Sequence, residues 1–128
     1  MSYYIKKEIE LDYPAAIERT KATLKENGFG VITEIDMQAT LKEKIGADIE
    51  PYIILGACNP NYANHALQKE ELIGLMLPCN VVVKANANGG STVAAVDPIE
   101  VMNPIDNEEL GEMAAEVREN LEKAIEQL

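Results

Sequence analysis

The sequence contains no tryptophan, one phenylalanine, one histidine and two cysteines in 128 residues. A small disulfide-bonded scaffold needs more cysteines than this, and two cysteines without a secretory segment indicate a reducing compartment, so we expect a cytoplasmic protein. No apolar run approaches the roughly 18 residues that a membrane helix requires. The first residues, from Met1 to Lys7, lack the apolar segment of a signal peptide. We therefore expect no membrane association.

Positive charge is also scarce. Eleven lysines and arginines stand against 22 aspartates and glutamates, which gives a net charge of −11. A chain with this charge repels phosphate backbones, and no basic stripe offsets it, so nucleic acid is not an expected partner. Arginine occurs only at Arg19 and Arg118, which argues against a strong clamp for an anionic ligand.

The apolar content is that of an ordinary globular protein. Hydrophobic residues make up 47% of the chain, a fraction typical of folded domains. A chain of this length buries about two-thirds of its unfolded surface, enough for one core without disulfides or metals. No internal repeat, low-complexity tract or long linker interrupts the sequence. We predict a single domain that spans residues 1–128.

The first half of the chain alternates between strand and helix patterns. Period-two alternation predicts half-buried strands, and Asp, Asn, Pro and Gly mark where helices begin and end. The segment 52–55 is apolar on both faces, which predicts an interior strand. In order, we predict a strand over 3–11, a helix from Asp12 to Gly28, a strand over 29–35, a short helix over 36–44 and a strand over 52–55.

The second half ends in the clearest helix of the sequence. Its apolar residues recur every three or four positions from Leu110 to Leu128, and such an amphipathic helix must lie on an apolar surface. Asp106 and Glu109 fit a capping box, which predicts Asp106 as the N-cap. Before this helix we predict a helix from Pro60, a turn or short helix over 70–76, a strand over 77–85, a hairpin turn over 86–90 and a strand over 92–96.

The order of these elements predicts the fold class. It reads strand, helix, four strands, helix, with small helical insertions around the third strand. Short connections between consecutive strands favour an antiparallel sheet with helices on one face. We therefore predict an α+β fold.

Two segments give the chain a specific resemblance. They are GACNP over 56–60 and IGLMLPCNVVV over 73–83, and GFGV over 28–31 and Asp97-Pro98 fit the same pattern. Together they resemble the signature of the domain-of-unknown-function 302 family over nearly the whole chain. The resemblance implies a TATA-binding-protein-like fold, a curved antiparallel sheet that grips a long C-terminal helix, and a homodimer. It implies no particular reaction, and the fold name does not imply DNA binding.

Two cysteines at strand ends form the candidate site. Cys58 ends the predicted third strand and Cys79 begins the fourth, so pairing of these strands would bring the two thiols close together. An asparagine follows each cysteine. We predict a small-ligand pocket lined by Cys58, Asn59, Cys79 and Asn80, although the pattern specifies no cofactor. Asn59 can equally cap the helix that follows it, and Asn80 can satisfy backbone groups at a strand irregularity.

The cysteines also allow other interpretations. Free cysteine is often a small core hydrophobe. A thiol pair could instead serve redox chemistry or a metal, but a helix N-terminus stabilises a thiolate by only ~0.3–1 kcal/mol, less than one pKa unit. The one histidine, His65, is expected on an exposed helix face. Structural zinc requires about four Cys or His ligands, so we assign neither metal ligands nor catalytic residues.

One apolar segment offers a possible contact between copies. The run Leu75-Met76-Leu77 beside Pro78 is either ordinary core or part of a two-fold interface. Three hypotheses for function therefore stay open. They are a small binding or interaction module with a ligand pocket, a thiol-dependent redox or metal-binding protein that uses the Cys58/Cys79 pair, and a purely structural homodimer subunit.

Overall fold

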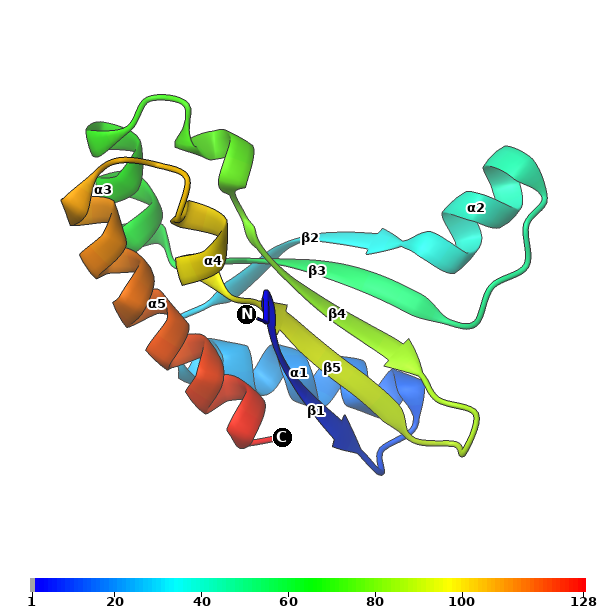
Figure 1. The fold of residues 1–128 in the computed structure, drawn as a ribbon. Coiled ribbons are helices and arrows are strands. Elements are labelled where there is room, and N and C mark those ends of the chain that lie inside the picture. Colours follow the sequence, from blue (N-terminus) through cyan, green and yellow to red (C-terminus); the bar gives the residue numbers. More distant parts are fainter. Residues whose placement is uncertain (1) are drawn as a thin grey trace.

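A computed structural model describes residues 2–128 and shows the predicted strands and helices in order, with one further short helix (Figure 1). No helix within this range is both long enough and apolar enough to cross a membrane. The elements are β1 (Tyr4–Ile9), α1 (Tyr13–Glu26), β2 (Gly30–Asp36), α2 (Met37–Ile45), β3 (Tyr52–Cys58), α3 (Pro60–Lys69), the 3₁₀-helix η1 (Ile73–Met76), β4 (Cys79–Ala85), β5 (Ser91–Val96), α4 (Pro98–Met102) and α5 (Glu108–Glu126).

The five strands form one open antiparallel sheet in the order β1-β5-β4-β3-β2. Consecutive strands from β2 to β5 pair with one another, and β1 returns beside β5 at the far edge. A register shift between Val31 and Thr33 leaves Ile32 as an extra residue in β2, a β-bulge that re-aims the side chain it inserts. The predicted α+β class and antiparallel sheet are confirmed.

The core lies between one face of this sheet and the helices α1 and α5 (Figure 1). Alternate residues of the inner strands β3, β4 and β5 point toward these helices, as expected for a period-two element. Leu24 of α1 and Leu121 of α5 are fully buried against them. The strands supply Ile53, Leu55, Ala57, Cys79, Val81, Val83, Val93 and Ala95 to this core.

Side chains from β1 and α1 hold the end of the long helix α5. Lys7 Nζ donates to the carbonyl oxygens of Glu126 and Leu128 at 3.0 and 2.8 Å. Arg19 donates to the carbonyl of Gln127 at 2.8 Å. Cations are favoured at a helix C-terminus because the unpaired carbonyls there carry partial negative charge. These contacts fix α5 across the sheet beside α1.

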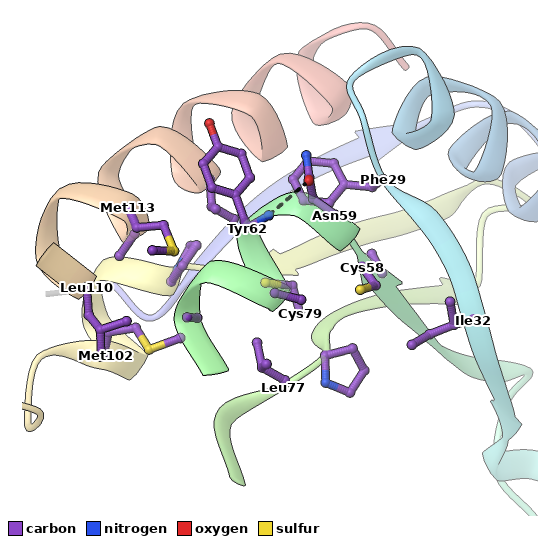
Figure 2. A pocket seen from close by; sticks show the side chains of 17 residues that line it. Phe29, Ile32, Cys58, Asn59, Tyr62, Leu77, Cys79, Met102, Leu110 and Met113 are labelled. Carbon is purple, nitrogen blue, oxygen red and sulfur yellow. Dashed lines mark hydrogen bonds between the residues drawn. The ribbon is translucent and has the colours of Figure 1, made fainter. Parts of the chain in front are cut away.

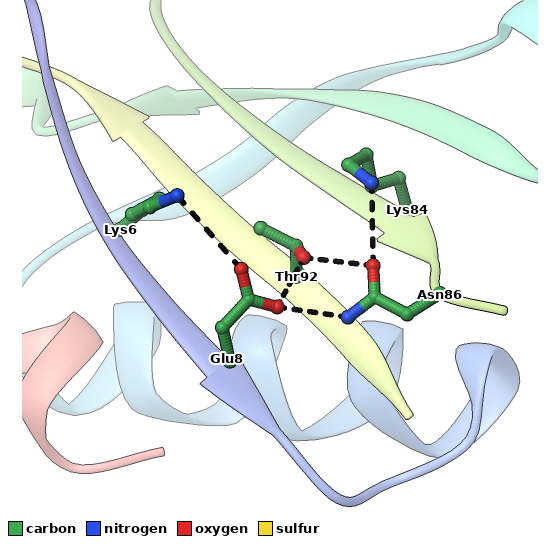
Figure 3. A network of polar contacts seen from close by, with 5 residues as sticks. All are labelled: Lys6, Glu8, Lys84, Asn86 and Thr92. Atoms are coloured by element: carbon green, nitrogen blue, oxygen red, sulfur yellow. Dashed lines mark hydrogen bonds and ion pairs between the residues drawn. The ribbon is translucent and has the colours of Figure 1, made fainter. Parts of the chain in front are cut away.

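The opposite face of the sheet carries a polar network (Figure 3). The Glu8 carboxylate accepts hydrogen bonds from the Thr92 hydroxyl and, at 2.8 Å, from Asn86 Nδ2. Lys84 Nζ donates to Asn86 Oδ1 at 3.2 Å, and Lys6 Nζ lies 3.9 Å from Glu8. The bonds from Thr92 and then Asn86 lower the pKa of Glu8, since they stabilise its charged form. The network joins β1, β5 and the end of β4.

Two features differ from the prediction. The N-cap of α5 is Asn107, whose Oδ1 accepts from the backbone N–H groups of Glu109 and Leu110, so the assignment of Asp106 was wrong by one residue. Both residue types cap well, and the sequence does not show which of two neighbours turns its side chain inward. The five-residue helix α4 was not predicted, although Asp97 before Pro98 is the same cap signal as Asn59 before Pro60.

Candidate ligand-binding site

A cavity of about 250 Å³ lies where the ends of β3 and β4 meet the helices α3, α4 and α5 (Figure 2). The strand ends supply Ala57, Cys58 and Cys79 to its lining. The segment before β4 adds Leu77 and Pro78. From the helices come Tyr62, Ala63 and Ala66 of α3, Pro98 and Met102 of α4, and Leu110, Met113, Ala114 and Val117 of α5.

The local sequence explains why a strand and a helix meet at this cavity. β3 and β4 pair with Ala57 opposite Cys79, so the end of one and the start of the other lie side by side. Asn59 follows β3 directly, and its Oδ1 accepts from the backbone N–H groups of Asn61 and Tyr62 at 3.1 and 3.3 Å. This cap starts α3 at once, with the Pro at its beginning suited to the first turn. The chain therefore turns from strand to helix at the cavity wall.

Gly56 allows β2 and the segment before β4 to approach β3 closely at the cavity wall. A Cβ at this position would lie 2.1 Å from Thr33 Oγ1 and 2.8 Å from Pro78 Cγ. Any larger residue would force Thr33 or the Leu77–Pro78 segment, whose peptide bond is cis, away from β3. Glycine is the residue that permits such a close approach. The sequence analysis did not predict this role of Gly56, because it used the segment 56–60 only as part of the family resemblance.

The structure brings three of the four predicted site residues together. Cys58, Asn59 and Cys79 all line the cavity, and Figure 2 shows them among its lining side chains. Asn80 does not reach it. Asn80 is exposed on the opposite sheet face together with Val82, because neighbouring residues of a strand point to opposite faces. The alternation of β4 already separates Asn80 from Cys79, so this could have been read from the sequence.

The two thiols are free but differ in exposure. Cys58 is half-buried, whereas Cys79 is only 9% exposed. Burial and, to a smaller extent, the neighbouring Cys58 together raise the pKa of Cys79 to about 11. At pH 7 about one Cys79 in 10,000 is then a thiolate, and the thiolate is the nucleophile and metal ligand. Cys79 therefore behaves as a neutral, apolar part of the cavity wall.

The polar groups near the cavity are engaged elsewhere. Tyr62 presents its ring, while its hydroxyl donates to Glu116 at 2.8 Å, a bond that raises the pKa of Tyr62. His65 does not line the cavity, and its Nε2 lies 3.8 Å from a carboxylate oxygen of Glu109. Within residues 2–128, no three His, Cys, Asp or Glu side chains gather in a way that could hold a metal ion. The lining contains no charged residue.

Sequence reasoning missed several residues of the lining. Leu110, Met113 and Val117 belong to the apolar stripe of α5, so their burial was predicted but not their place beside the cysteines. Ile32 reaches the cavity because it is the extra residue of the bulge, and Met102 because it ends the unpredicted helix α4. Neither position carries a sequence signal that separates it from an ordinary strand or loop residue.

The chain can now be compared with known proteins. Residues 5–128 match the family described as Domain of unknown function DUF302. The chain belongs to this family. A similar solved structure, the crystal structure of an uncharacterized conserved protein DUF302 from Bacillus stearothermophilus, superimposes with a TM-score of 0.90 and 29% sequence identity. The match covers 99% of this chain and 98% of that one. A comparison with curated proteins gives no match.

The family membership confirms the resemblance carried by the two cysteine segments. Nearly all of both chains takes part in the structural match, so the sheet and the terminal helix belong to the DUF302 fold. The family description names no ligand or reaction. A functional interpretation therefore depends on the geometry of the cavity.

Proposed function

We propose that this protein is a small binding module, one domain over residues 1–128, that holds a small-molecule ligand in the cavity beside Cys58, Asn59 and Cys79. Asn80 stands outside the proposed site because it lies on the other face of the sheet. The observation that carries the proposal is the cavity itself, about 250 Å³ in volume and formed by both cysteine segments. Apolar cavities of about 150 Å³ in other proteins already bind benzene.

The wall of this cavity supports binding rather than catalysis. Concave, mostly apolar pockets with few polar groups are the usual form of small-molecule sites. A catalytic site needs a nucleophile or a titrating acid or base whose pKa lies near the working pH. The neutral Cys79 thiol does not meet that need, because its pKa of about 11 is far above neutrality.

Native mass spectrometry of the purified full chain tests the proposal. We expect a copurified small molecule that is released from the protein on mild collisional activation. If none copurifies, we expect at least one compound in a thermal-shift screen of neutral and charged molecules to raise the melting temperature of the protein. Ala63→Leu adds bulk to the cavity wall on α3 and should abolish either signal. Ala115→Leu, on the exposed face of α5, should leave it intact. A ligand-binding role would be refuted if the wild-type chain carries no copurified mass and no compound in the screen stabilises it.

A thiol-dependent redox or metal-binding role is the alternative function. It is supported by two free thiols that line one cavity. Alkylation of each cysteine by iodoacetamide, followed over pH by peptide mass spectrometry, distinguishes the two roles. Rapid labelling of both residues near pH 7 would favour the thiol role. Labelling of Cys79 only at strongly alkaline pH or after unfolding supports the binding module.

We also propose that two copies of the chain associate in the cytoplasm. Exposed leucines on and before η1 support this homodimer, since Leu72 is 70% and Leu75 is 82% exposed. Met76 at the end of η1 and Leu67 in the preceding helix α3 are further exposed apolar side chains. Such clustered apolar side chains are typical of protein interaction sites. The free thiols agree with a reducing compartment. A purely structural dimer without a ligand would lose support if the cavity proves to be occupied.

A further inference from the structure

The chemistry of the cavity lining specifies a class of ligand. We propose that the ligand is an uncharged aromatic molecule of one or two rings, an inference that rests on the proposed ligand-binding function. Four observations carry it: the absence of charge in the lining, the sulfur atoms around it, the two aromatic rings beside it and its volume.

An ionised ligand would find no oppositely charged partner in this cavity. None of the 17 lining residues is charged. Asn59 already uses its Oδ1 to cap α3, and the Tyr62 hydroxyl already donates to Glu116. A buried charge without a partner loses its hydration uncompensated. An anion would also meet the repulsion of a chain with a net charge of −11. These facts favour a neutral ligand.

Sulfur atoms surround the cavity. Six sulfur-bearing residues occur within residues 2–128, and four of them, Cys58, Cys79, Met102 and Met113, line this one cavity. Thioether sulfur makes favourable contacts with aromatic rings at about 5 Å, often at the ring edge. Figure 2 shows Met102 and Met113 on one side of the cavity and the two cysteines on the other. A flat ring between these groups would meet polarizable sulfur from both sides.

Two protein rings add to this preference. Phe29 and Tyr62 both belong to the lining. Two aromatic rings in edge-to-face or offset contact gain more free energy than the burial of their surface area alone provides. An aromatic ligand therefore gains from Phe29 and Tyr62 as well as from the sulfur atoms. A saturated ligand of the same shape gains only from the removal of apolar surface from water.

The volume limits the ligand to a few rings. A cavity of about 150 Å³ accommodates benzene, and this one measures about 250 Å³. The difference leaves room for a second ring or a short substituent. The half-buried Leu77 and the 63% exposed Ile32 lie at the cavity and leave a path to solvent. A molecule of the size of toluene or indole fits this space.

Titration calorimetry of the full wild-type chain with matched probes tests the class of ligand. The probes are toluene and indole, the saturated isostere methylcyclohexane, and benzoate and benzylammonium at pH 7. We expect toluene and indole to bind at least about tenfold more tightly than either ion. We expect toluene to bind about threefold more tightly than methylcyclohexane, the scale of one or two sulfur–aromatic contacts.

Two variants test the role of sulfur. Met113→Leu and Met102→Leu keep the volume nearly constant and remove a thioether, so the preference for toluene over methylcyclohexane should shrink while methylcyclohexane binding stays the same. Ala115→Leu on the exposed side of α5 is the control and should leave every affinity unchanged. An unchanged preference in both methionine variants would overturn the role of the thioether sulfurs in selecting an aromatic ligand.

The outcomes separate this inference from the function on which it rests. Tighter binding of benzoate, benzylammonium or methylcyclohexane than of toluene would overturn the neutral aromatic class and leave a ligand-binding module in place. Failure of all five probes, together with an empty native mass spectrum and no hit in the thermal screen, would overturn both. Binding of toluene that survives Ala63→Leu unchanged would place the ligand outside this cavity and overturn the inference as well.

Discussion

Cys79 shows how the environment of one residue decides its chemistry. The same side chain in water would be partly ionised at mildly alkaline pH. Here the sheet and α5 bury it, and its pKa rises to about 11. A residue that the sequence offers as a candidate nucleophile is therefore a neutral wall group in the fold.

The raised pKa of Cys79 makes stability depend on pH. Below pH 9 both the folded and the unfolded chain keep the thiol proton, so the Cys79 thiol makes its full contribution to the free energy of unfolding. Between the ordinary value of 9.0 and about 11 the unfolded chain loses this proton and the folded chain keeps it, so stability falls as pH rises. We expect the free energy of unfolding to fall by up to about 2–3 kcal/mol over this interval because of Cys79. Urea denaturation between pH 7 and pH 11 measures the decline.

Two variants isolate this contribution from other groups that titrate at alkaline pH. Cys79→Ala removes the titrating thiol, so its unfolding free energy should decline less steeply than that of the wild type. Cys58→Ala keeps the buried thiol and should retain most of the wild-type decline. Parallel pH profiles for the wild type and Cys79→Ala would contradict the assignment.

Glu8 provides a second residue-scale prediction, at acidic pH. Its folded-state pKa lies below the ordinary value of 4.5, chiefly because Thr92 donates a hydrogen bond to the carboxylate. The contribution to stability is present above pH 4.5 and is lost as pH falls through the lowered pKa. Thr92→Val removes the first cause and should move the Glu8 pKa upward. Carbon-detected NMR titration of the Glu8 carboxyl group measures it; a midpoint that Thr92→Val leaves unchanged would argue against this bond.

At the scale of elements, the start of a helix depends on one N-cap side chain that accepts hydrogen bonds from the first backbone N–H groups. Asn107→Ala should cost about 1 kcal/mol of unfolding free energy, because the backbone N–H groups of Glu109 and Leu110 lose their acceptor. Asp106→Ala, one residue earlier and exposed, is the matched control and should cost little. Chemical denaturation of both variants compares the two costs. A larger cost at Asp106 would restore the capping box inferred from the sequence.

The close approach of β2, β3 and the segment before β4 depends on Gly56. Gly56→Ala should cost about 1–3 kcal/mol, the usual penalty for overpacking, because its Cβ would overlap Thr33 Oγ1 and the Pro78 ring. Gly74→Ala is the control, since a Cβ there meets nothing within 4 Å. Thermal and urea unfolding measure both. In a Thr33→Ala background the cost of Gly56→Ala should shrink, and an unchanged cost would mean that Thr33 is not the obstacle.

At the scale of the whole molecule, the prediction concerns association. If two copies meet through the exposed leucines around η1, Leu75→Glu should shift the protein toward the monomer in sedimentation at micromolar concentration. Its melting temperature measured at low concentration should stay close to that of the wild type, because Leu75 is 82% exposed. Ile45→Glu, on α2 at the far end of the molecule, is a control with 74% exposure. A wild-type chain that sediments as a monomer would remove the homodimer.

Much of this architecture was predictable because periodicity and capping residues in the sequence predict local secondary structure. Alternation over β1 and β4 and the three-and-four spacing of α5 predicted which faces are buried. Asp12, Asp36 and Asn59 each predicted a helix start that the structure confirms. These signals need no knowledge of distant residues, because a cap or a period acts over a few positions.

The sequence by itself determined the strand and helix order, the antiparallel sheet and the placement of two cysteines at neighbouring strand ends. Only the tertiary structure decided that Ile32, Met102 and Met113, from three separate elements, meet those cysteines around one cavity. It also decided that Cys79 is buried enough to stay neutral. The physical reason is range: periodicity and capping arise between neighbours in the chain, whereas a cavity and a desolvated thiol arise from the packing of elements distant in sequence.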